Sequence, residues 1–225
     1  MILDALDALN GELLGCRRCP RLVEWREKVA REKRRAYRDQ EYWGKPVPGF
    51  GDPRARIFVV GLAPGAHGSN RTGRMFTGDD SGRFLYTALH RAGFANQATG
   101  DAPNDGLVIS NLWITAVCRC VPPDNKPLPG EITNCRSFLT REMDALSELK
   151  GIVALGRIAY DAAILLAGRS DDKKVFGHGV LCETKDNKPW ILASYHPSRQ
   201  NTQTGRLTKP MFDEIWMKVK SLLAN

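Results

Sequence analysis

The sequence lacks any apolar run near the roughly 20 residues needed to cross a bilayer, so no membrane-spanning helix is expected. Its opening stretch, MILDALDALNGELLG, carries acidic residues and no basic segment, which argues against a secretory signal. The chain also has no internal repeat and no low-complexity tract. These absences predict a globular cytoplasmic protein, and 225 residues suit a single domain over 1–225.

The motifs that hold nucleotide phosphates are missing too. The stretch GSNRTGRM has the glycine spacing of a Walker A loop but continues with Arg74 and Met75. That loop needs Lys followed by Ser or Thr, because the lysine reaches the terminal phosphates. No G-x-G-x-x-G occurs either. The glycine-rich loop GLAPGAHGSN, at 61–70, therefore holds something other than a nucleotide phosphate, and it has no carboxylate of its own.

Acidic residues are outnumbered, with 25 Asp and Glu against 33 Lys and Arg, and the formal net charge is +8. This balance favours an anionic partner, of which nucleic acid is the commonest, although solubility alone is the alternative. Part of the excess lies in REKVAREKRRAYR, at 26–38, which reads as a helix. Such a helix is either a solvated face or a surface that lies along phosphates.

Solid apolar runs alternate with helical patterns along the chain. Strands are expected in RIFVVGL, GLVISNLW, GIVALG, FGHGVLCET and KPWILASYHP. Helices are expected over 2–15, 81–94, 129–150, 157–168 and 209–224, with Ser81 as the N-cap of the second of these. A further, basic helix is expected to follow the CRRCPRL turn and to run to about Gln40. The alternation predicts a three-layer α/β/α sandwich with a mostly parallel central sheet. Ligands of such folds bind at the carboxyl ends of the strands, where GLAPGAHGSN and HPSRQNTQTG begin.

Four of the six cysteines have a spacing typical of a metal site. Cys16 and Cys19 form a C-x2-C pair, and Cys120 and Cys135 follow about a hundred residues later. In a cytosolic chain, metal binding is favoured over disulfides. The wide second spacing suits an iron–sulfur cluster held by four thiolates better than structural zinc. The segment at about 1–45 is then a cluster-binding segment, although two buried thiols remain the alternative for the C-x2-C pair.

The other two cysteines are interpreted differently. Cys118 competes with Cys120 for the third ligand position because only one residue separates them. Cys182 lies in an expected strand and is better explained as a small buried apolar residue.

Four stretches, GLAPGAHGSNRTGR, FTGDDSGRFL, CRCVPPDNKP and HPSRQNTQTGRL, resemble family 5, the b-type, of the uracil-DNA glycosylase superfamily. The resemblance extends over nearly the whole chain and includes the cysteine framework. It implies a doubly wound α/β sandwich, cleavage of the N-glycosidic bond of uracil in DNA, frequent acceptance of hypoxanthine and other damaged bases, and a 4Fe–4S cluster. The implied partner is DNA that contains deaminated bases, double-stranded with single-stranded as an open alternative, and the protein is expected to be a monomer.

The same resemblance implies roles for acidic and aromatic residues. Related families carry a water-activating carboxylate in the first motif, where this chain has Leu62 and Ala63. The acid would come instead from Asp79, whose alternative role is an N-cap-like one. Phe76 matches the aromatic residue that stacks on the base, with core packing as its alternative.

Two further residues match groups that contact the base. His196 corresponds to the donor that hydrogen-bonds the uracil O2 oxygen and stabilises the departing base as an anion. Asn125 corresponds to a pocket residue whose amide reads the uracil edge, with a turn role as its alternative. The remaining histidines, His90 and His178, are expected to be structural.

The two long loops complete the implied site. The first loop would wall a pocket for a flipped base, with His67 at the entrance; its base-binding residues are Gly61, Ala63, Pro64, Gly65 and His67, beside Phe76. The second would enter the DNA groove, with contacts from Ser198, Arg199, Gln200, Arg206 and Lys209.

No lysine lies in the glycine-rich loop or in the catalytic motifs that carry Asp79 and His196, so we expect a monofunctional glycosylase that uses water rather than a Schiff-base lyase. The chain also lacks the Lys-Arg-Arg-Ile-His insertion of the branch that forms a covalent DNA adduct, which predicts turnover. One alternative is a non-catalytic iron–sulfur DNA-binding protein, favoured by the missing motif carboxylate. A second is a hydrolase of free nucleosides, which the basic charge and the long groove-type loop oppose.

Overall fold

A six-stranded sheet forms the centre of the molecule in a computed structural model that describes residues 2–172, 174–186 and 188–224. The strands are β1 (Phe50–Gly51), β2 (Ile57–Gly61), β3 (Leu112–Ala116), β4 (Gly151–Leu155), β5 (Leu181–Cys182) and β6 (Trp190–Ser194). Their order is β1-β3-β2-β4-β6-β5, with the four inner strands parallel and the two edge strands antiparallel. The mostly parallel sheet predicted from the sequence is confirmed.

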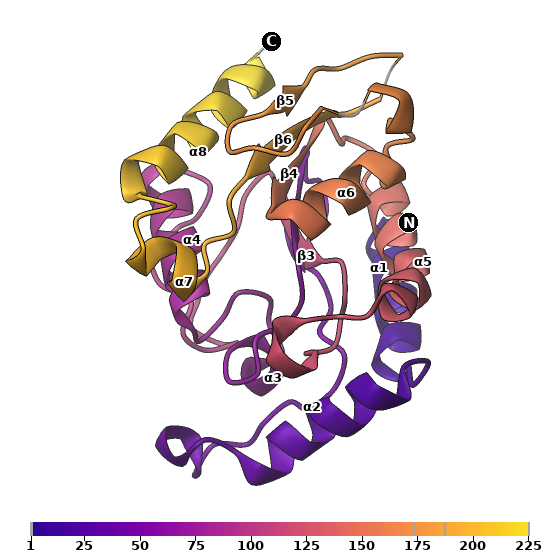
Figure 1. The fold of residues 1–225 in the computed structure, drawn as a ribbon, viewed down its shortest axis with the longest axis vertical. Coiled ribbons are helices and arrows are strands. Elements are labelled where there is room, and N and C mark those ends of the chain that lie inside the picture. Colours follow the sequence, from indigo (N-terminus) through magenta and orange to yellow (C-terminus); the bar gives the residue numbers. More distant parts are fainter. Residues whose placement is uncertain (1, 173, 187, 225) are drawn as a thin grey trace.

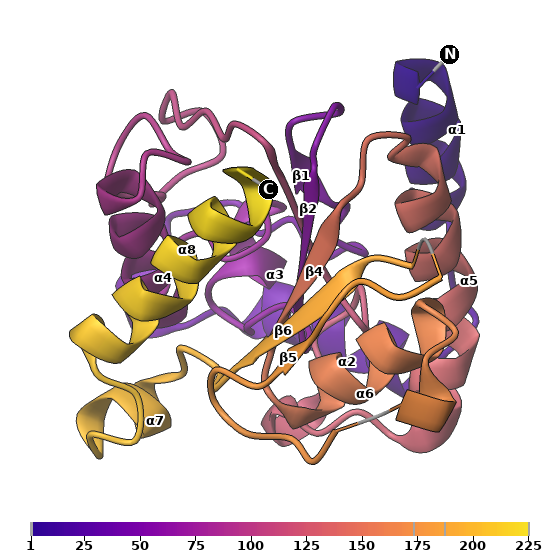
Figure 2. The same ribbon diagram turned by 90° about the horizontal axis from the view of Figure 1, so that it is seen from above.

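Helices cover both faces of this sheet, which gives the three layers visible in Figures 1 and 2. On one face lie α4 (Asp80–Arg91) and α8 (Lys209–Ala224), and on the other lie α1 (Ile2–Leu14), α5 (Pro129–Ala145) and α6 (Arg157–Leu166). A hydrophobic core lies on each face of the sheet. Because side chains alternate along a strand, Ile57 and Val59 of β2 pack into one core, and Phe58 and Val60 pack into the other. Among the described residues, no helix is both long and apolar enough to cross a membrane.

The register of the inner strands brings three loops to one edge of the sheet. Gly61 at the end of β2 pairs with Ala116 at the end of β3, and Leu155 of β4 pairs with Ser194 of β6. The loops that follow β2, β3 and β6 therefore leave from the same edge, as expected for a ligand site in a parallel sheet. The short α3 (Ser69–Thr72) lies there, and it contacts α2 (Pro20–Glu32), which runs past the same end of the molecule (Figure 1).

Several helix boundaries differ from the sequence prediction: α5 ends at Ala145 rather than at residue 150, and α4 ends at Arg91 rather than at Phe94. The basic helix does not reach Gln40: α2 ends at Glu32, because Lys33 adopts a left-handed φ of 52°, and a short 3-10 turn follows. Ser81 is not the N-cap of α4; Asp79 is, and its side chain accepts a hydrogen bond from the Gly82 amide.

Strand and loop boundaries also differ. The strand expected in GLVISNLW begins only at Leu112, after Asn111 turns the chain with a φ of 62°. FGHGVLCET contributes the two residues of β5, and its His178 is structural, since its Nδ1 accepts a hydrogen bond from the Tyr195 amide. The HPSRQNTQTG loop contains one short helix, α7 (Arg199–Gln203).

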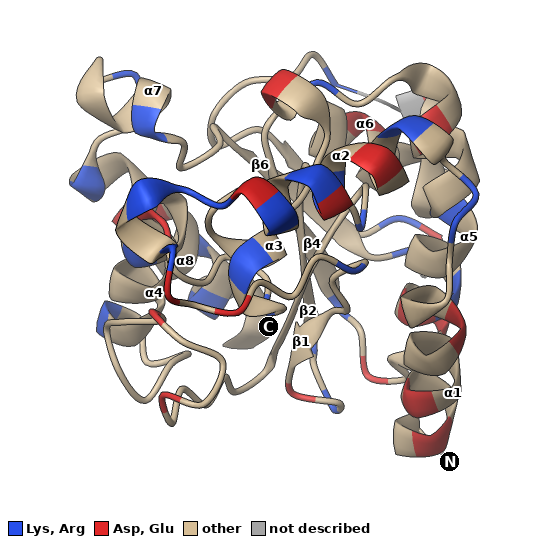
Figure 3. Cartoon of the chain, turned by 90° about the horizontal axis from the view of Figure 1, so that it is seen from below, with Lys and Arg blue, Asp and Glu red and all other residues tan. Residues whose placement is uncertain are grey.

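Charge is unevenly distributed over the fold. Figure 3 shows Lys and Arg interspersed with Glu along α2 and also around α7, whereas α1 carries Asp and Glu without Lys or Arg. The basic regions lie on the side of the molecule where the loops after β2 and β6 emerge.

Candidate active site

The carboxylate of Asp79 lies against the glycine-rich loop, which has no acid of its own. Its Oδ1 atom accepts a hydrogen bond from the Gly82 amide at 2.9 Å. Its Oδ2 atom faces Gly65 and Gly68: a Cβ at these two positions would fall 2.7 and 2.1 Å from it. The loop therefore makes room for a carboxylate supplied by the start of α4. The capping role and a site role of Asp79 coexist, because each uses a different oxygen.

Burial between the loop and the helix raises the pKa of Asp79 above its ordinary value. Hydrogen bonds from the Gly82 and Ser81 amides act in the opposite direction, since they stabilise the charged form. Asp79 therefore holds its proton to a higher pH than an exposed aspartate does. A carboxyl group in this condition is suited to accept a proton from water.

Phe76 has a conformation that bulky residues rarely adopt, with a φ of 52°. Three neighbours hold it there. A Cβ at Gly61 would lie 2.7 Å from the Phe76 ring, and one at Gly82 would lie 1.7 Å from its carbonyl oxygen. Tyr86 donates a hydrogen bond to the preceding carbonyl, that of Met75, at 2.6 Å. Backbone strain maintained in this way is typical of functional sites.

The imidazole of His196 stacks on the Phe76 ring, with centroids 6.0 Å apart and planes 27° apart. His196 follows β6, and its carbonyl accepts a hydrogen bond from Asn201 Nδ2 at 2.9 Å, which fixes the loop before α7. Burial lowers the pKa of His196 to about 4. The ring is therefore neutral near pH 7, and a neutral imidazole offers one N–H donor without bringing a cation into the site.

His67 occupies the outer part of the glycine-rich loop. Its Nδ1 atom lies 3.1 Å from the hydroxyl of Tyr42. Burial, with the charges of Arg34 and Arg71, lowers its pKa. Segment 34–42 thus borders the loop, which the sequence alone did not indicate. The other loop residues expected to bind the base lie at the end of β2 or directly after it, and they are Gly61, Ala63, Pro64 and Gly65.

Asn125 lies on the loop that leaves β3 at the same sheet edge. It ends a 3-10 turn, Pro123–Asn125, with a left-handed φ of 55°, and it is exposed. Its side chain forms no hydrogen bond with any other residue that the structure describes, so its amide is free to meet a ligand. Its role in reading the base stays a prediction.

The residues expected to contact DNA lie on and around α7. Ser198 is the N-cap of this helix, and Arg199 and Gln200 are its first, exposed residues. The Arg206 guanidinium lies 4.8 Å from the centre of the Tyr195 ring, and Lys209 begins α8. Together they form an exposed, basic ridge next to His196, in a position to meet a phosphate backbone.

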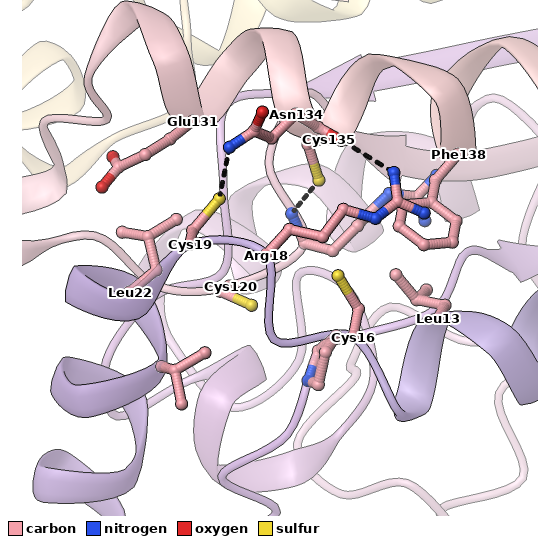
Figure 4. A pocket seen from close by; sticks show the side chains of 13 residues that line it. Leu13, Cys16, Arg18, Cys19, Leu22, Cys120, Glu131, Asn134, Cys135 and Phe138 are labelled. Atoms are coloured by element: carbon pink, nitrogen blue, oxygen red, sulfur yellow. Dashed lines mark hydrogen bonds between the residues drawn. The ribbon is translucent and has the colours of Figure 1, made fainter.

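A separate cavity lies between the loop after α1, the start of α2 and α5. Figure 4 shows the sulfur atoms of Cys16, Cys19, Cys120 and Cys135 around it. Apolar side chains complete its walls, among them Leu13, Leu22, Val23 and Phe138. Within the described residues, no three His, Cys, Asp or Glu side chains are grouped to hold a single metal ion.

The two remaining cysteines lie elsewhere. Cys118 is fully buried and is absent from the residues that line the cavity. Cys182 is buried as predicted, with its sulfur 3.4 Å from the Tyr160 hydroxyl.

Three of the four sulfur atoms in the cavity accept hydrogen bonds. Arg26 Nη1 donates to Cys120 at 2.9 Å, the Arg119 amide to Cys135 at 3.3 Å, and Asn134 Nδ2 to Cys19 at 3.5 Å (Figure 4 draws the last two). Burial nevertheless raises the pKa of Cys135 to about 12 and also raises that of Cys120. Sequence reasoning missed these donors, because the only signal for Arg26 was its place in a basic helix, where a solvated side chain was expected.

Residues 48–220 match the model of the uracil DNA glycosylase superfamily. The chain is 51% identical to a type-5 uracil-DNA glycosylase of Thermus thermophilus over 216 residues, which cover 96% of this chain and 97% of the relative. A type-5 uracil-DNA glycosylase of Mycobacterium tuberculosis is also 51% identical, over 95% of this chain and 80% of the relative. One from Pyrobaculum aerophilum is 42% identical, over 93% and 89%. The chain therefore belongs to the uracil-DNA glycosylase superfamily, and within it to the type-5 group.

Proposed function

We propose that this protein removes uracil from DNA by hydrolysing the bond between the base and its sugar, the first step of base excision repair. The observation that carries the proposal is the stacked pair of Phe76 and His196 at the sheet edge where the Asp79 carboxylate lies against the glycine-rich loop. The type-5 relatives support it by name. A purely DNA-binding role is not favoured, because a strained aromatic residue and a neutral buried histidine serve no evident purpose in it.

The site can carry out hydrolysis as follows. A uracil flipped from the duplex stacks on the ring of Phe76, with the glycine-rich loop as the wall of the pocket. As the bond from C1′ to N1 breaks, its electron pair passes to the base, and the N–H of His196 stabilises the resulting anion at O2. The oxygen of a water molecule bonds to C1′, and its proton passes to the carboxylate of Asp79. The glycine-rich loop and the stretches that carry Asp79 and His196 contain no lysine, so an abasic site is the product.

The range of substrates is part of the proposal. We infer that hypoxanthine and other deaminated bases are also accepted, because the glycine-rich loop GLAPGAHGSN offers backbone and mostly small side chains to a flipped base. Asn125 is the side chain proposed to read the base edge. The ridge of Arg199, Arg206 and Lys209 would hold the backbone on either side of the flipped nucleotide in duplex DNA, and also in single strands. The protein would act as a monomer.

We also propose that the four cysteines hold a 4Fe–4S cluster. The support is the donor set: Cys16, Cys19, Cys120 and Cys135 surround one mostly apolar cavity, and N–H groups point at three of the sulfurs. Each thiolate of such a cluster binds a different iron, so the sulfurs must surround a space rather than meet at a point. When bound, the cluster would supply the positive charge that allows buried thiols to ionise.

A nicking assay tests the function. Duplexes that carry a single uracil, hypoxanthine or xanthine are incubated with the protein and then treated with alkali, which cleaves the strand at an abasic site. We expect cleavage of the uracil duplex only after alkali, and cleavage of the hypoxanthine duplex at a lower rate. Cleavage without alkali would contradict the monofunctional mechanism, and an uncut uracil strand would refute the proposed activity.

A further inference from the structure

Arg26 connects the cysteine cavity to the glycine-rich loop of the active site. Its guanidinium donates to Cys120 Sγ at 2.9 Å and to the carbonyl of Cys16 at 3.3 Å. Its own carbonyl accepts a hydrogen bond from Asn70 Nδ2 at 3.3 Å. Both residues are almost completely enclosed, with 3% of Arg26 and none of Asn70 exposed. A charged side chain at this depth is uncommon unless it has a specific partner.

Asn70 is the last residue of the glycine-rich loop and bonds both to the middle of the loop and to the segment before β1. Its amide donates to the carbonyl of Gly65 at 3.0 Å, and its carbonyl accepts from the amide of Gly44 at 3.0 Å. Gly65 is in turn one of the two glycines against which Asp79 Oδ2 lies. The contacts thus run without a gap from a cysteine sulfur through Arg26 and Asn70 to the surroundings of the catalytic carboxylate.

We infer that Arg26 and Asn70 are positioning residues through which the occupied cysteine site holds the glycine-rich loop against Asp79. The inference rests on the proposed glycosylase function. Bonding of Arg26 to the sulfur fixes α2 at this residue, and α2 then presents the carbonyl on which Asn70 docks. If the cysteine site is disturbed, α2 can shift and the loop loses its anchor. A displacement of about 1 Å in a group that positions a reacting water can cost about a hundredfold in rate.

The test uses substitutions at each end of the link. In Asn70→Ala, we expect the single-turnover rate on uracil duplex to fall by about ten- to a hundredfold, with unchanged affinity for DNA and unchanged iron content and visible absorption. In Arg26→Met, we expect both the absorption of the thiolate-bound iron and the rate to change, and Arg26→Lys should restore part of each. Effects on rate in the double variant should be less than additive, because both residues act through one link.

Asn134→Ala is the matched control. This side chain also donates to a cysteine sulfur, that of Cys19, and among the described residues it has no hydrogen bond to the glycine-rich loop. It should alter the iron absorption and leave the rate within about twofold, because the bonds from Arg26 to Cys120 and from Asn70 to Arg26 remain. If Asn70→Ala does not fold, Asn70→Ser replaces it, since serine keeps a polar group but is too short to reach the Arg26 carbonyl.

Hydrogen–deuterium exchange gives a readout that does not depend on activity. Amides of residues 65–72 should exchange faster in Asn70→Ala, in Arg26→Met and in wild-type protein treated with an iron chelator, but not in Asn134→Ala. A wild-type rate in Asn70→Ala, a joint loss of iron and rate in that variant, or unchanged exchange would each overturn the link. An inactive wild-type protein would instead refute the proposed function, whatever the exchange shows.

Discussion

Gly68 lies so close to Asp79 that a Cβ atom at position 68 would fall 2.1 Å from the carboxylate oxygen Oδ2. The space that glycine leaves is thus occupied by the acid, and position 68 determines where that acid can lie.

Gly68→Ala should therefore displace the carboxylate and lower the single-turnover rate on uracil duplex by about ten- to a hundredfold. Affinity for DNA should stay within about twofold, because the basic ridge is untouched. Gly11→Ala in α1 is the control, since a Cβ there meets no atom within 4 Å. Equal rates for the two variants would show that the loop does not position Asp79.

His196→Ala should lower the rate of the chemical step by about two to three powers of ten, as for the loss of one fixed donor at a developing anion. Binding of uracil duplex should change little. Single-turnover kinetics with excess protein separate the two quantities. If affinity fell sharply while the rate survived, His196 would be a DNA contact and not the group that stabilises the base.

Asp79→Asn keeps the size and the capping hydrogen bond of the side chain but removes its charge. We expect a larger loss on hypoxanthine than on uracil. The uracil anion leaves readily once His196 stabilises it, whereas the purine has fewer fitted contacts and depends more on the remaining groups. Paired single-turnover assays on the two duplexes measure this. Near-wild-type rates on both would reduce Asp79 to a helix cap.

The rate should fall in acid because Asp79 takes up a proton. Its pKa is raised by burial, so the carboxylate is present at high pH and is lost as the pH falls, at a pH above the ordinary 3.8 of aspartate. Burial lowers the pKa of His196 to about 4, so protonation of that ring also belongs to the acid range, and the Asp79→Asn variant separates the two groups. A pH profile of the single-turnover rate should show this acid limb, and Asp79→Asn should lack it. A limb that persists in the variant would assign it to another group.

Purified protein should be brown and contain about four iron atoms per chain, as four thiolate ligands imply. Replacing Cys16 or Cys135 by Ala should release the iron and cost folding stability, because the site joins distant segments. Cys118→Ala should retain the iron, since that side chain lies outside the cavity. Iron analysis and thermal unfolding provide the measurements. A colourless protein with stoichiometric zinc would contradict the cluster.

Much of the fold follows from local pattern. The uninterrupted apolar runs that became β2, β4 and β6 allow only buried parallel strands, and the amphipathic stretch 209–224 has the bounds expected for α8. The boundaries that were wrong depend on left-handed backbone at Lys33 and Asn111. Asn adopts that conformation more readily than most residues, but a lysine there gives no local signal.

The sequence predicted the individual residues of the site. Asp79, Phe76 and His196 each stand in a distinctive motif, and the structure brings them to one sheet edge. Contacts between residues that are distant in sequence could not be predicted in this way. Arg26 shares a helix face with Leu22, Val23 and Val29, which are buried, but its charge favoured a solvated position, and its partner Cys120 is far away in sequence.

The order of the strands has a consequence for how activity is gained during folding. Phe76 follows β2 and His196 follows β6, and these strands do not pair with each other, because β4 lies between them. The stacked rings therefore meet only after all three strands have assembled, whichever pair forms first. A partly folded chain in which only the glycine-rich loop after β2 is in place should therefore be inactive. Excision of a base therefore requires that β2, β4 and β6 are all in place.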